Sequence, residues 1–268
     1  SGDWSSDVCS SDLGRKLGRR CKPMLSTKRT AMASADHLLS KDPANWPFAA
    51  VLFDCDGVLV DSETITNRVL RDMLEEIGWS MSLSDCMDFF VGKTVREERA
   101  LIEAKTGHAF FESWLQSFYE RRNHALQASL EVMDGALAAV QAAHKHCQGR
   151  IACASGADRF KIRLQLEKTG LLSFFEGRIF SGHEMPRSKP APDVYLAAAR
   201  GLGVDPSHCL VIEDTTVGIR AGVGAGALVW ALSPQPSGDE ALRQAGASRI
   251  FRSMAQLPDL WAEIGAIA

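Results

Sequence analysis

Residues 49–62 of the chain read AAVLFDCDGVLVDS. The apolar part of this stretch predicts a buried strand that ends at Gly57, with Asp54 and Asp56 at its end. Residues i and i+2 of a strand point to the same side, so both carboxylates can approach one site. Two acids held so close repel each other, which implies a cation, a proton or a reaction that needs both. Taken alone, the same letters also fit an Asx turn that caps a strand.

The composition is that of an ordinary globular protein. Of the 268 residues, 46% are hydrophobic and 24% are charged, and the net charge is −3. This balance gives no reason to expect a nucleic-acid partner, and no stretch approaches the roughly 18 uninterrupted apolar residues that would indicate a membrane span. The seven cysteines show no C-x-x-C spacing, which favours a reducing, cytoplasmic location over a disulfide framework. A monomer is the default expectation.

Residues 1–46 differ from the rest of the chain. They are rich in Ser, Lys and Arg and show no helical or strand period. Residues 5–13, SSDVCSSDL, resemble a translated sequencing adapter, in which case the natural start could be Met24 or Met32. A basic leader poor in acids also fits an organelle transit peptide. We expect a disordered leader, artefact or targeting segment, and assign it no function.

From residue 48 onward, short apolar runs alternate with amphipathic helical stretches. The predicted strands are 49–53, 150–154, 178–180, 208–212, 227–231 and 249–251. The predicted helices between and after them are 135–147, 158–169, 192–202, 215–224 and 254–265. Apolar strands separated by helices of this length predict an α/β fold, a Rossmann-like parallel sheet with helices on both faces.

Residues 63–128 interrupt this alternation because they contain no convincing strand. An apolar stripe at helical spacing covers residues 65–77, and Gly78 ends it. Further helical patterns occupy 83–90, 95–106 and 111–127. We expect a helical cap domain at 63–128 inserted into a core formed by 47–62 and 129–268. A large insertion with no active role is the alternative.

Polar residues also follow the next two predicted strands. Strand 150–154 runs into Ser155 and Gly156, where a hydroxyl and the free backbone N–H groups of a helix start suit an anion. Ser155 would serve equally well as the N-cap of that helix. Lys189 comes after the following strand, and Pro190 restricts the backbone beside it, so this lysine is held in place.

Strand 208–212 ends at Glu213 and Asp214. One acid at this place is a good helix N-cap, but two at the end of a buried strand are costly without a cation. The carboxyl ends of strands in an open parallel sheet converge on one crevice, so we expect this pair to meet Asp54 and Asp56.

The charges at such a crevice indicate what it binds. A phosphate monoester that enters the crevice adds up to about two negative charges to those of the four acids. A divalent cation and Lys189 are then needed to offset this charge before the substrate can bind. A proton on Asp56 would remove one further negative charge. Ligation by oxygen alone favours Mg²⁺ over zinc.

Four ordered strings, FDCDGVLVDS, ASG, KPAPD and IEDTTVGI, resemble the four signatures of the haloacid dehalogenase superfamily. The resemblance spans roughly residues 48–232. The helical insertion after the first string is similar to the cap of the subfamily that contains phosphoglycolate phosphatases, β-phosphoglucomutases and sugar-phosphate phosphatases. It implies a Mg²⁺-dependent phosphatase acting on a small phosphate ester, such as a sugar phosphate or sugar-acid phosphate.

The resemblance also implies roles for individual residues. Asp54 would take the phosphoryl group as an aspartyl-phosphate. Asp56 would protonate the leaving alcohol and then activate the hydrolytic water. Ser155 and Lys189 would hold the phosphoryl oxygens, with Gly156 beside them.

By the same resemblance, Mg²⁺ would be bound by Asp54, the backbone carbonyl of Asp56, and Asp214. Glu213 would be a further ligand or would support the ligands. Gly57 is expected to border the substrate site.

Several alternatives remain at this point. Dehalogenases of the superfamily typically lack the acid found here as Asp56. In β-phosphoglucomutases a cap histidine stands five residues after the equivalent of Asp61, whereas this chain has Thr66, which favours hydrolysis over mutase chemistry. A catalytically idle binding protein on the same fold is the third alternative, since fold does not dictate function.

The cap segment 90–98 resembles the substrate-specificity loop of the family. Lys93 and Arg96 in this segment are predicted to bind a second anionic group of the substrate, such as a sugar carboxylate. A solvated helix start explains the same two residues equally well.

Overall fold

A computed structural model describes residues 47–90, 93–109 and 111–267 of the chain, with side chains described up to residue 263. The expected leader at 1–46 lies outside these residues. None of the helices in the described part is long and apolar enough to cross a membrane.

The strands described for this chain form one parallel sheet in the order β3-β2-β1-β4-β5-β6. They are β1 Ala50–Phe53, β2 Ile151–Ser155, β3 Ile179–Ser181, β4 Cys209–Glu213, β5 Leu228–Leu232 and β6 Arg249–Phe251. Each lies within one residue of its predicted bounds. β1 lies between β2 and β4, where Phe53 is in register with Cys153 and Ile212. The predicted α/β class with a Rossmann-like sheet is confirmed.

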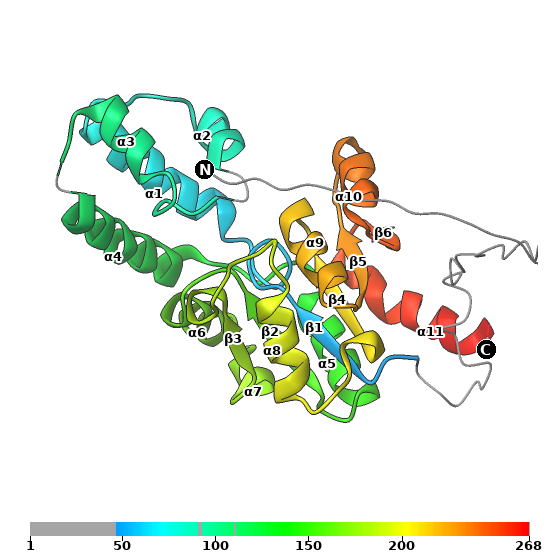
Figure 1. Ribbon diagram of the computed structural model, residues 1–268. Helices are drawn as coiled ribbons and strands as arrows, with labels where there is room; N and C mark the ends of the chain where they lie inside the picture. Colours follow the sequence, from blue (N-terminus) through cyan, green and yellow to red (C-terminus); the bar gives the residue numbers. More distant parts are fainter. Residues whose placement is uncertain (1–46, 91–92, 110, 268) are drawn as a thin grey trace, which may run out of the picture. The chain divides into compact units, whose positions relative to one another are not determined.

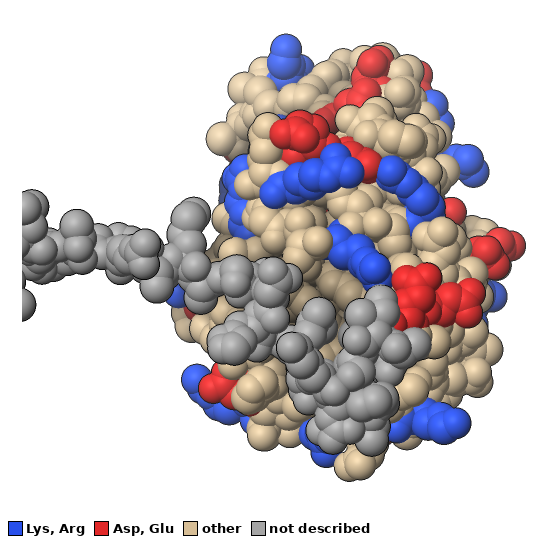
Figure 2. Space-filling model, turned by 90° about the vertical axis from the view of Figure 1, so that its right-hand side faces the viewer, with Lys and Arg blue, Asp and Glu red and all other residues tan. Residues whose placement is uncertain are grey.

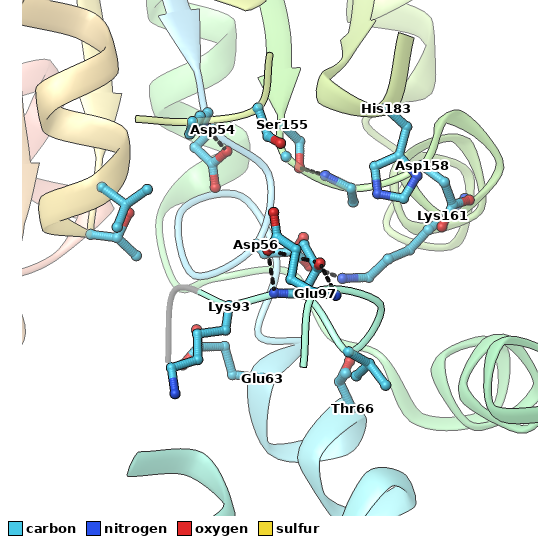
Figure 3. A pocket seen from close by; sticks show the side chains of 18 of the residues that line it. Asp54, Asp56, Glu63, Thr66, Lys93, Glu97, Ser155, Asp158, Lys161 and His183 are labelled. Atoms are coloured by element: carbon cyan, nitrogen blue, oxygen red, sulfur yellow. Dashed lines mark hydrogen bonds and ion pairs between the residues drawn. The ribbon is translucent and has the colours of Figure 1, made fainter. Parts of the chain in front are cut away.

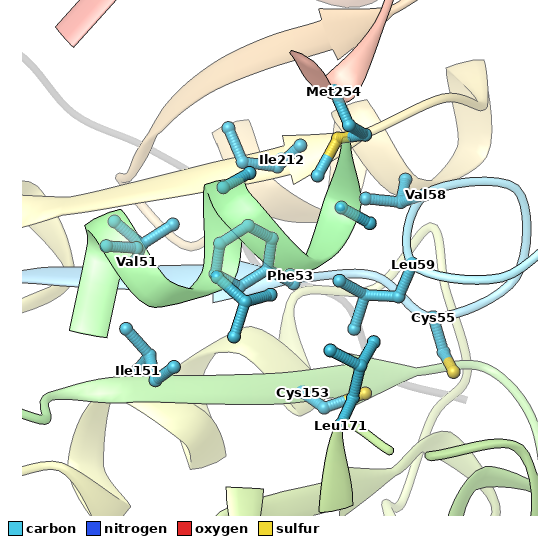
Figure 4. Packing of buried hydrophobic residues seen from close by; sticks show 14 of the residues in the cluster. Val51, Phe53, Cys55, Val58, Leu59, Ile151, Cys153, Leu171, Ile212 and Met254 are labelled. Atoms are coloured by element: carbon cyan, nitrogen blue, oxygen red, sulfur yellow. The ribbon is translucent and has the colours of Figure 1, made fainter. Parts of the chain in front are cut away.

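The two faces of the sheet bury alternate residues of β1, as the pleat requires. Val51 and Phe53 belong to the hydrophobic cluster on one face, part of which Figure 4 shows, whereas Ala50 and Leu52 belong to the cluster on the other. Helices cover both faces (Figure 1). The first face packs against α5 Ala136–His146, α6 Arg159–Lys168, α7 Leu172–Phe175 and α11 Leu257–Ile267. The second packs against α8 Asp193–Gly201, α9 Thr216–Gly224 and α10 Asp239–Ala245.

Some short elements were not predicted from the sequence. These are α7, α10 and the single 3₁₀ turns at Gly182–Glu184, Pro206–His208 and Pro236–Gly238, whereas the 3₁₀ turn Met254–Gln256 forms the start of the predicted helix 254–265. The first of these turns brings His183 toward the candidate site.

The insertion after β1 is helical, as expected. Its helices are α1 Glu63–Glu76, α2 Leu83–Phe90, α3 Arg99–Thr106 and α4 Phe111–Ser129. They share a hydrophobic cluster that is separate from the two clusters of the sheet and is formed by Leu70, Met73, Leu74, Cys86, Phe90, Ile102, Phe111, Trp114, Leu115 and Phe118. The separate cluster supports an inserted domain, whose bounds at 63–128 stay a prediction.

Charged side chains of both signs lie interspersed on the face of the molecule in Figure 2, over a surface made mostly of other residues. On that face they form no broad field of one sign.

Candidate active site

Asp54 is the first residue after β1, and only 6% of its surface is exposed. Its backbone N–H donates to the carbonyl of Ile212 at 3.0 Å, which continues the pairing with β4. Its Oδ1 accepts a hydrogen bond from Lys189 Nζ at 2.7 Å. Burial raises the pKa of Asp54 to about 7; the Lys189 charge opposes this effect, and the charges of Glu213 and Asp56 add to it. Such strongly perturbed acids concentrate at functional sites.

Lys189 connects the ends of three strands. Its ammonium lies within hydrogen-bond distance of four oxygens, namely Asp54 Oδ1, the Ala154 carbonyl at 3.1 Å, the Tyr195 hydroxyl at 2.9 Å and Glu213 Oε1 at 2.8 Å, which share its three N–H donors. Its side chain is 9% exposed. Burial alone would lower the pKa of Lys189, but the charges of Asp54 and Glu213 raise it well above its ordinary value. Sequence reasoning missed Tyr195, which is buried on α8 and also donates to Glu213.

Glu213 accepts hydrogen bonds on both carboxylate oxygens. Oε1 receives Lys189, and Oε2 receives the backbone N–H of Asp214 at 2.9 Å and both the backbone N–H and the hydroxyl of Thr215 at 3.0 Å. Burial opposes its charge, but Lys189 and these donors lower the pKa of Glu213. Helix α9 approaches so closely that a side chain at Gly218 would overlap the Glu213 carboxylate. Glu213 is therefore held ionised and fixed by the protein itself.

Asp214 lacks such partners. Its Oδ1 is buried and accepts no hydrogen bond from the described residues, and burial, followed by the charges of Glu213 and Asp54, raises its pKa well above the ordinary value. Oxygens of Asp54, Glu213 and Asp214 lie within 4.8 Å of one another. A buried carboxylate oxygen without a donor, in a cluster made only of carboxylates, fits a hard divalent cation such as Mg²⁺. A side chain at Gly57 would overlap Asp214 Oδ2, so this glycine borders the same cluster.

Asp56 is held by residues that sequence reasoning missed. Its Oδ1 accepts from Lys161 Nζ and from Gln165 Nε2, both at 2.7 Å, and from the hydroxyl of Ser62. Burial favours the neutral acid, but the Lys161 charge and these hydrogen bonds outweigh it and lower the pKa of Asp56 to about 2. The proton that the sequence argument placed on Asp56 is therefore absent from this arrangement at neutral pH.

Ser155 ends β2, is 1% exposed and lines the pocket together with Gly156. Its hydroxyl oxygen accepts from the backbone N–H of Ala157 at 3.1 Å, which leaves its O–H free to donate to a ligand. The alternative reading of Ser155 as a helix N-cap is wrong, because Asp158 caps α6 by accepting from the Lys161 backbone N–H at 2.8 Å.

A pocket of about 260 Å³ brings the predicted catalytic residues together. Asp54, Asp56, Ser155, Lys189 and Glu213 all line it. Figure 3 shows Asp54 and Asp56 in this pocket, with the Lys161 ammonium reaching Asp56. The remaining wall comes from the helical insert, from the start of α6 and from the segment around His183.

The two basic residues of the predicted specificity loop differ in position. Lys93 lines the pocket, but its ammonium lies 3.6 Å from Glu98 and 4.0 Å from the centre of the Phe89 ring, and its side chain extends away from both aspartates in Figure 3. Arg96 does not line the pocket and pairs with Glu112 at 3.3 Å. The structure therefore does not bring Arg96 to this pocket.

Known proteins are similar to this chain in sequence and in fold. Residues 48–226 match the family model of haloacid dehalogenase-like hydrolases. The 6-phosphogluconate phosphatase of Escherichia coli K12 is 27% identical over 79% of this chain and 94% of its own length. The fructose-1-phosphate phosphatase YqaB of the same strain is 27% identical over 67% of this chain and 93% of its own. A solved hydrolase from Deinococcus radiodurans R1, with bound phosphate and sodium, is 33% identical, with a TM-score of 0.66 over 82% of this chain and 98% of that chain.

Proposed function

This chain belongs to the haloacid dehalogenase-like hydrolase family, and we propose that it is a Mg²⁺-dependent phosphatase that cleaves a small sugar phosphate or sugar-acid phosphate through an aspartyl-phosphate. The observation that carries the proposal is the meeting of the buried Asp54 and the buried Lys189 in one pocket, beside the unpaired carboxylate oxygen of Asp214. The phosphatases among its relatives support it.

In the first step a carboxylate oxygen of Asp54 forms a bond to phosphorus, and the bond from phosphorus to the ester oxygen breaks. Lys189 keeps the second carboxylate oxygen oriented and offsets charge on the phosphoryl group. The Ser155 O–H donates to a phosphoryl oxygen. Mg²⁺ bound at Asp54 and Asp214 would offset the remaining negative charge of that group.

Asp56 serves both steps in turn. The leaving oxygen takes a proton from Asp56, and the resulting carboxylate then removes a proton from the water that attacks phosphorus and frees Asp54. The contacts to Lys161 and Gln165 favour the carboxylate that the second step needs. A phosphate dianion beside Asp56 favours the protonated form that the first step needs, since like charges raise the pKa of an acid.

The test is hydrolysis of 4-nitrophenyl phosphate by the purified full chain, with Mg²⁺ and with a chelator. We expect turnover only with Mg²⁺ and a loss of at least about 1,000-fold in kcat for Asp54→Asn, because the amide cannot act as the nucleophile. Asp88→Asn, an exposed substitution of the same kind on α2, is the control and should keep full activity. Equal rates for Asp54→Asn and the unmodified chain would overturn the proposal.

A further inference from the structure

Helix α1 presents two unsatisfied polar groups to the pocket. Glu63 and Thr66, one turn apart on the same face of the helix, both line it. Thr66 Oγ1 is buried and has no hydrogen-bond partner in the described part of the chain. Among the described residues, the Glu63 carboxylate forms no hydrogen bond and no ion pair either. Polar groups that face a pocket without protein partners are the groups that a ligand satisfies.

The cations around the pocket, in contrast, are already paired. Among the described residues of its lining, six carry a carboxyl group and four are Lys or Arg. Each of those four has a carboxylate partner: Lys189 pairs with Asp54 and Glu213, Lys161 with Asp56, Arg122 with Asp158, and Lys93 with Glu98. The one further basic side chain of this lining is His183, which is exposed and lies near the charge of Asp158.

Arg122 shows how firmly one of these cations is held. Its surface is 6% exposed, and its guanidinium donates to Asp158 Oδ2 at 3.0 Å and to Asn123 Oδ1 at 2.8 Å. It also lies 4.8 Å from the centre of the Tyr119 ring and 5.9 Å from that of Phe118. A second anionic group of a substrate would have to compete with Asp158 for the charge of Arg122.

The same wall suits an uncharged, hydroxylated molecule. Phe118 and Tyr119 line the pocket and offer apolar ring surface to the C–H groups of a carbon chain. Carboxylates such as Glu63 accept strong hydrogen bonds from hydroxyl groups. A hydroxyl both donates and accepts, so it can satisfy Glu63 and Thr66 together.

We propose that the leaving group is an uncharged polyol or sugar, that Glu63 and Thr66 bind its hydroxyls, and that phosphate esters carrying a second anionic group are disfavoured. This inference rests on the proposed phosphatase function and narrows its substrate class. It departs from the sequence expectation that Lys93 and Arg96 bind such a second anion. A substrate carboxylate about 6 Å from the Glu63 carboxylate, at an effective dielectric constant near 20, would be repelled strongly enough to weaken binding by roughly 100-fold.

The experiment compares two esters of the same carbon chain. Glucitol 6-phosphate and gluconate 6-phosphate differ only at carbon 1, which is an alcohol in the first and a carboxylate in the second. We expect kcat/KM to be at least about tenfold higher for the glucitol ester. In Glu63→Gln the ratio of kcat/KM for the glucitol ester to that for the gluconate ester should fall about tenfold, because the amide keeps the shape of the side chain and loses its charge. Thr66→Val should lower kcat/KM for the glucitol ester several-fold, mainly through KM.

The ratio between the two esters is the readout, so a general loss of activity in a variant cancels. Glu75→Gln, an exposed substitution on the same helix, makes the same change of charge and should leave the ratio unaltered. A preference for the gluconate ester, turnover of neither ester by a chain that hydrolyses aryl phosphate, or an unchanged ratio in Glu63→Gln would overturn the inference.

A failure of the proposed function gives a different pattern. If the unmodified chain hydrolyses neither ester nor 4-nitrophenyl phosphate, the phosphatase proposal fails. Calorimetric binding of the two esters to Asp54→Asn then still decides the inference, because tighter binding of the glucitol ester supports it and tighter or equal binding of the gluconate ester overturns it.

Discussion

Gly57 lies in the turn that follows β1 at the candidate site. Its backbone has a φ of +76°, which L side chains rarely adopt, and a Cβ there would overlap Asp214 Oδ2. We expect Gly57→Ala to displace the Asp214 carboxylate and to raise the Mg²⁺ concentration for half-maximal activity more than about tenfold, since one ligand would move. A Mg²⁺ titration of aryl phosphate hydrolysis measures this change.

Gly78 provides the matched control. It also has a positive φ, +92°, but a Cβ there would meet nothing within 4 Å. Gly78→Ala should therefore lower the free energy of unfolding by about 1 kcal/mol through backbone strain and keep the Mg²⁺ requirement. If both substitutions raised that requirement equally, the contact between Gly57 and Asp214 would not be its cause.

The site residues that could be identified from the sequence are those whose immediate sequence neighbours indicate their role. Asp54, Asp56 and Lys189 stand beside strand ends, glycine or proline, where a side chain has a defined direction. Lys161 and Gln165 lie within α6, more than a hundred residues from Asp56 along the chain. Polar side chains within an amphipathic helix are usually solvated, so only the packing of α6 against the end of β1 shows that these two hold a carboxylate.

The strands were predicted more accurately than the short helices, because only the strands have a clear local pattern in the sequence. The strands are apolar runs buried on both faces, and each run is limited by polar residues, so their bounds are close to those expected. α7 has four residues and α10 has seven, too few for a helical period to show in the sequence.

The helices of the insert depend on a hydrophobic cluster of their own. Leu115 on α4 is 1% exposed and belongs to that cluster. We expect Leu115→Ala to lower the free energy of unfolding by about 2–5 kcal/mol, the usual cost of such a cavity. Because the sheet has separate clusters, hydrogen exchange should quicken in α1–α4 and change little in β1, β2 and β4.

The exposed Leu137 on α5 is the control for this substitution. It is 44% exposed, so Leu137→Ala should change the free energy of unfolding by less than about 1 kcal/mol. Faster exchange spread evenly over the sheet and the insert in Leu115→Ala would contradict a separately folded insert.

The stability of the whole molecule is expected to depend on Mg²⁺. Buried acids around Asp214 are costly without a cation, and a ligand at 100 times its Kd stabilises the folded chain by about 2.7 kcal/mol. In a chain of this size, this raises Tm by about 5–10 °C. Thermal unfolding monitored by circular dichroism, with Mg²⁺ and with a chelator, measures the shift.

Asp214→Asn should abolish that shift and leave the chain no less stable in the chelator, because it removes a charge that burial disfavours. Asp88→Asn should keep the shift. A full shift in Asp214→Asn would place the cation elsewhere.

The contacts of Lys189 indicate which site residues are retained in relatives of this chain that lose activity. Its ammonium bonds to groups at the ends of β1, β2 and β4, so selection for a well-packed sheet retains this lysine even after turnover has been lost. Asp214 differs, because its buried oxygen has no donor among the described residues and its contribution to stability depends on a bound cation. In a pseudoenzyme of this lineage the aspartate should decay first, and its survival is the better sign of an active descendant.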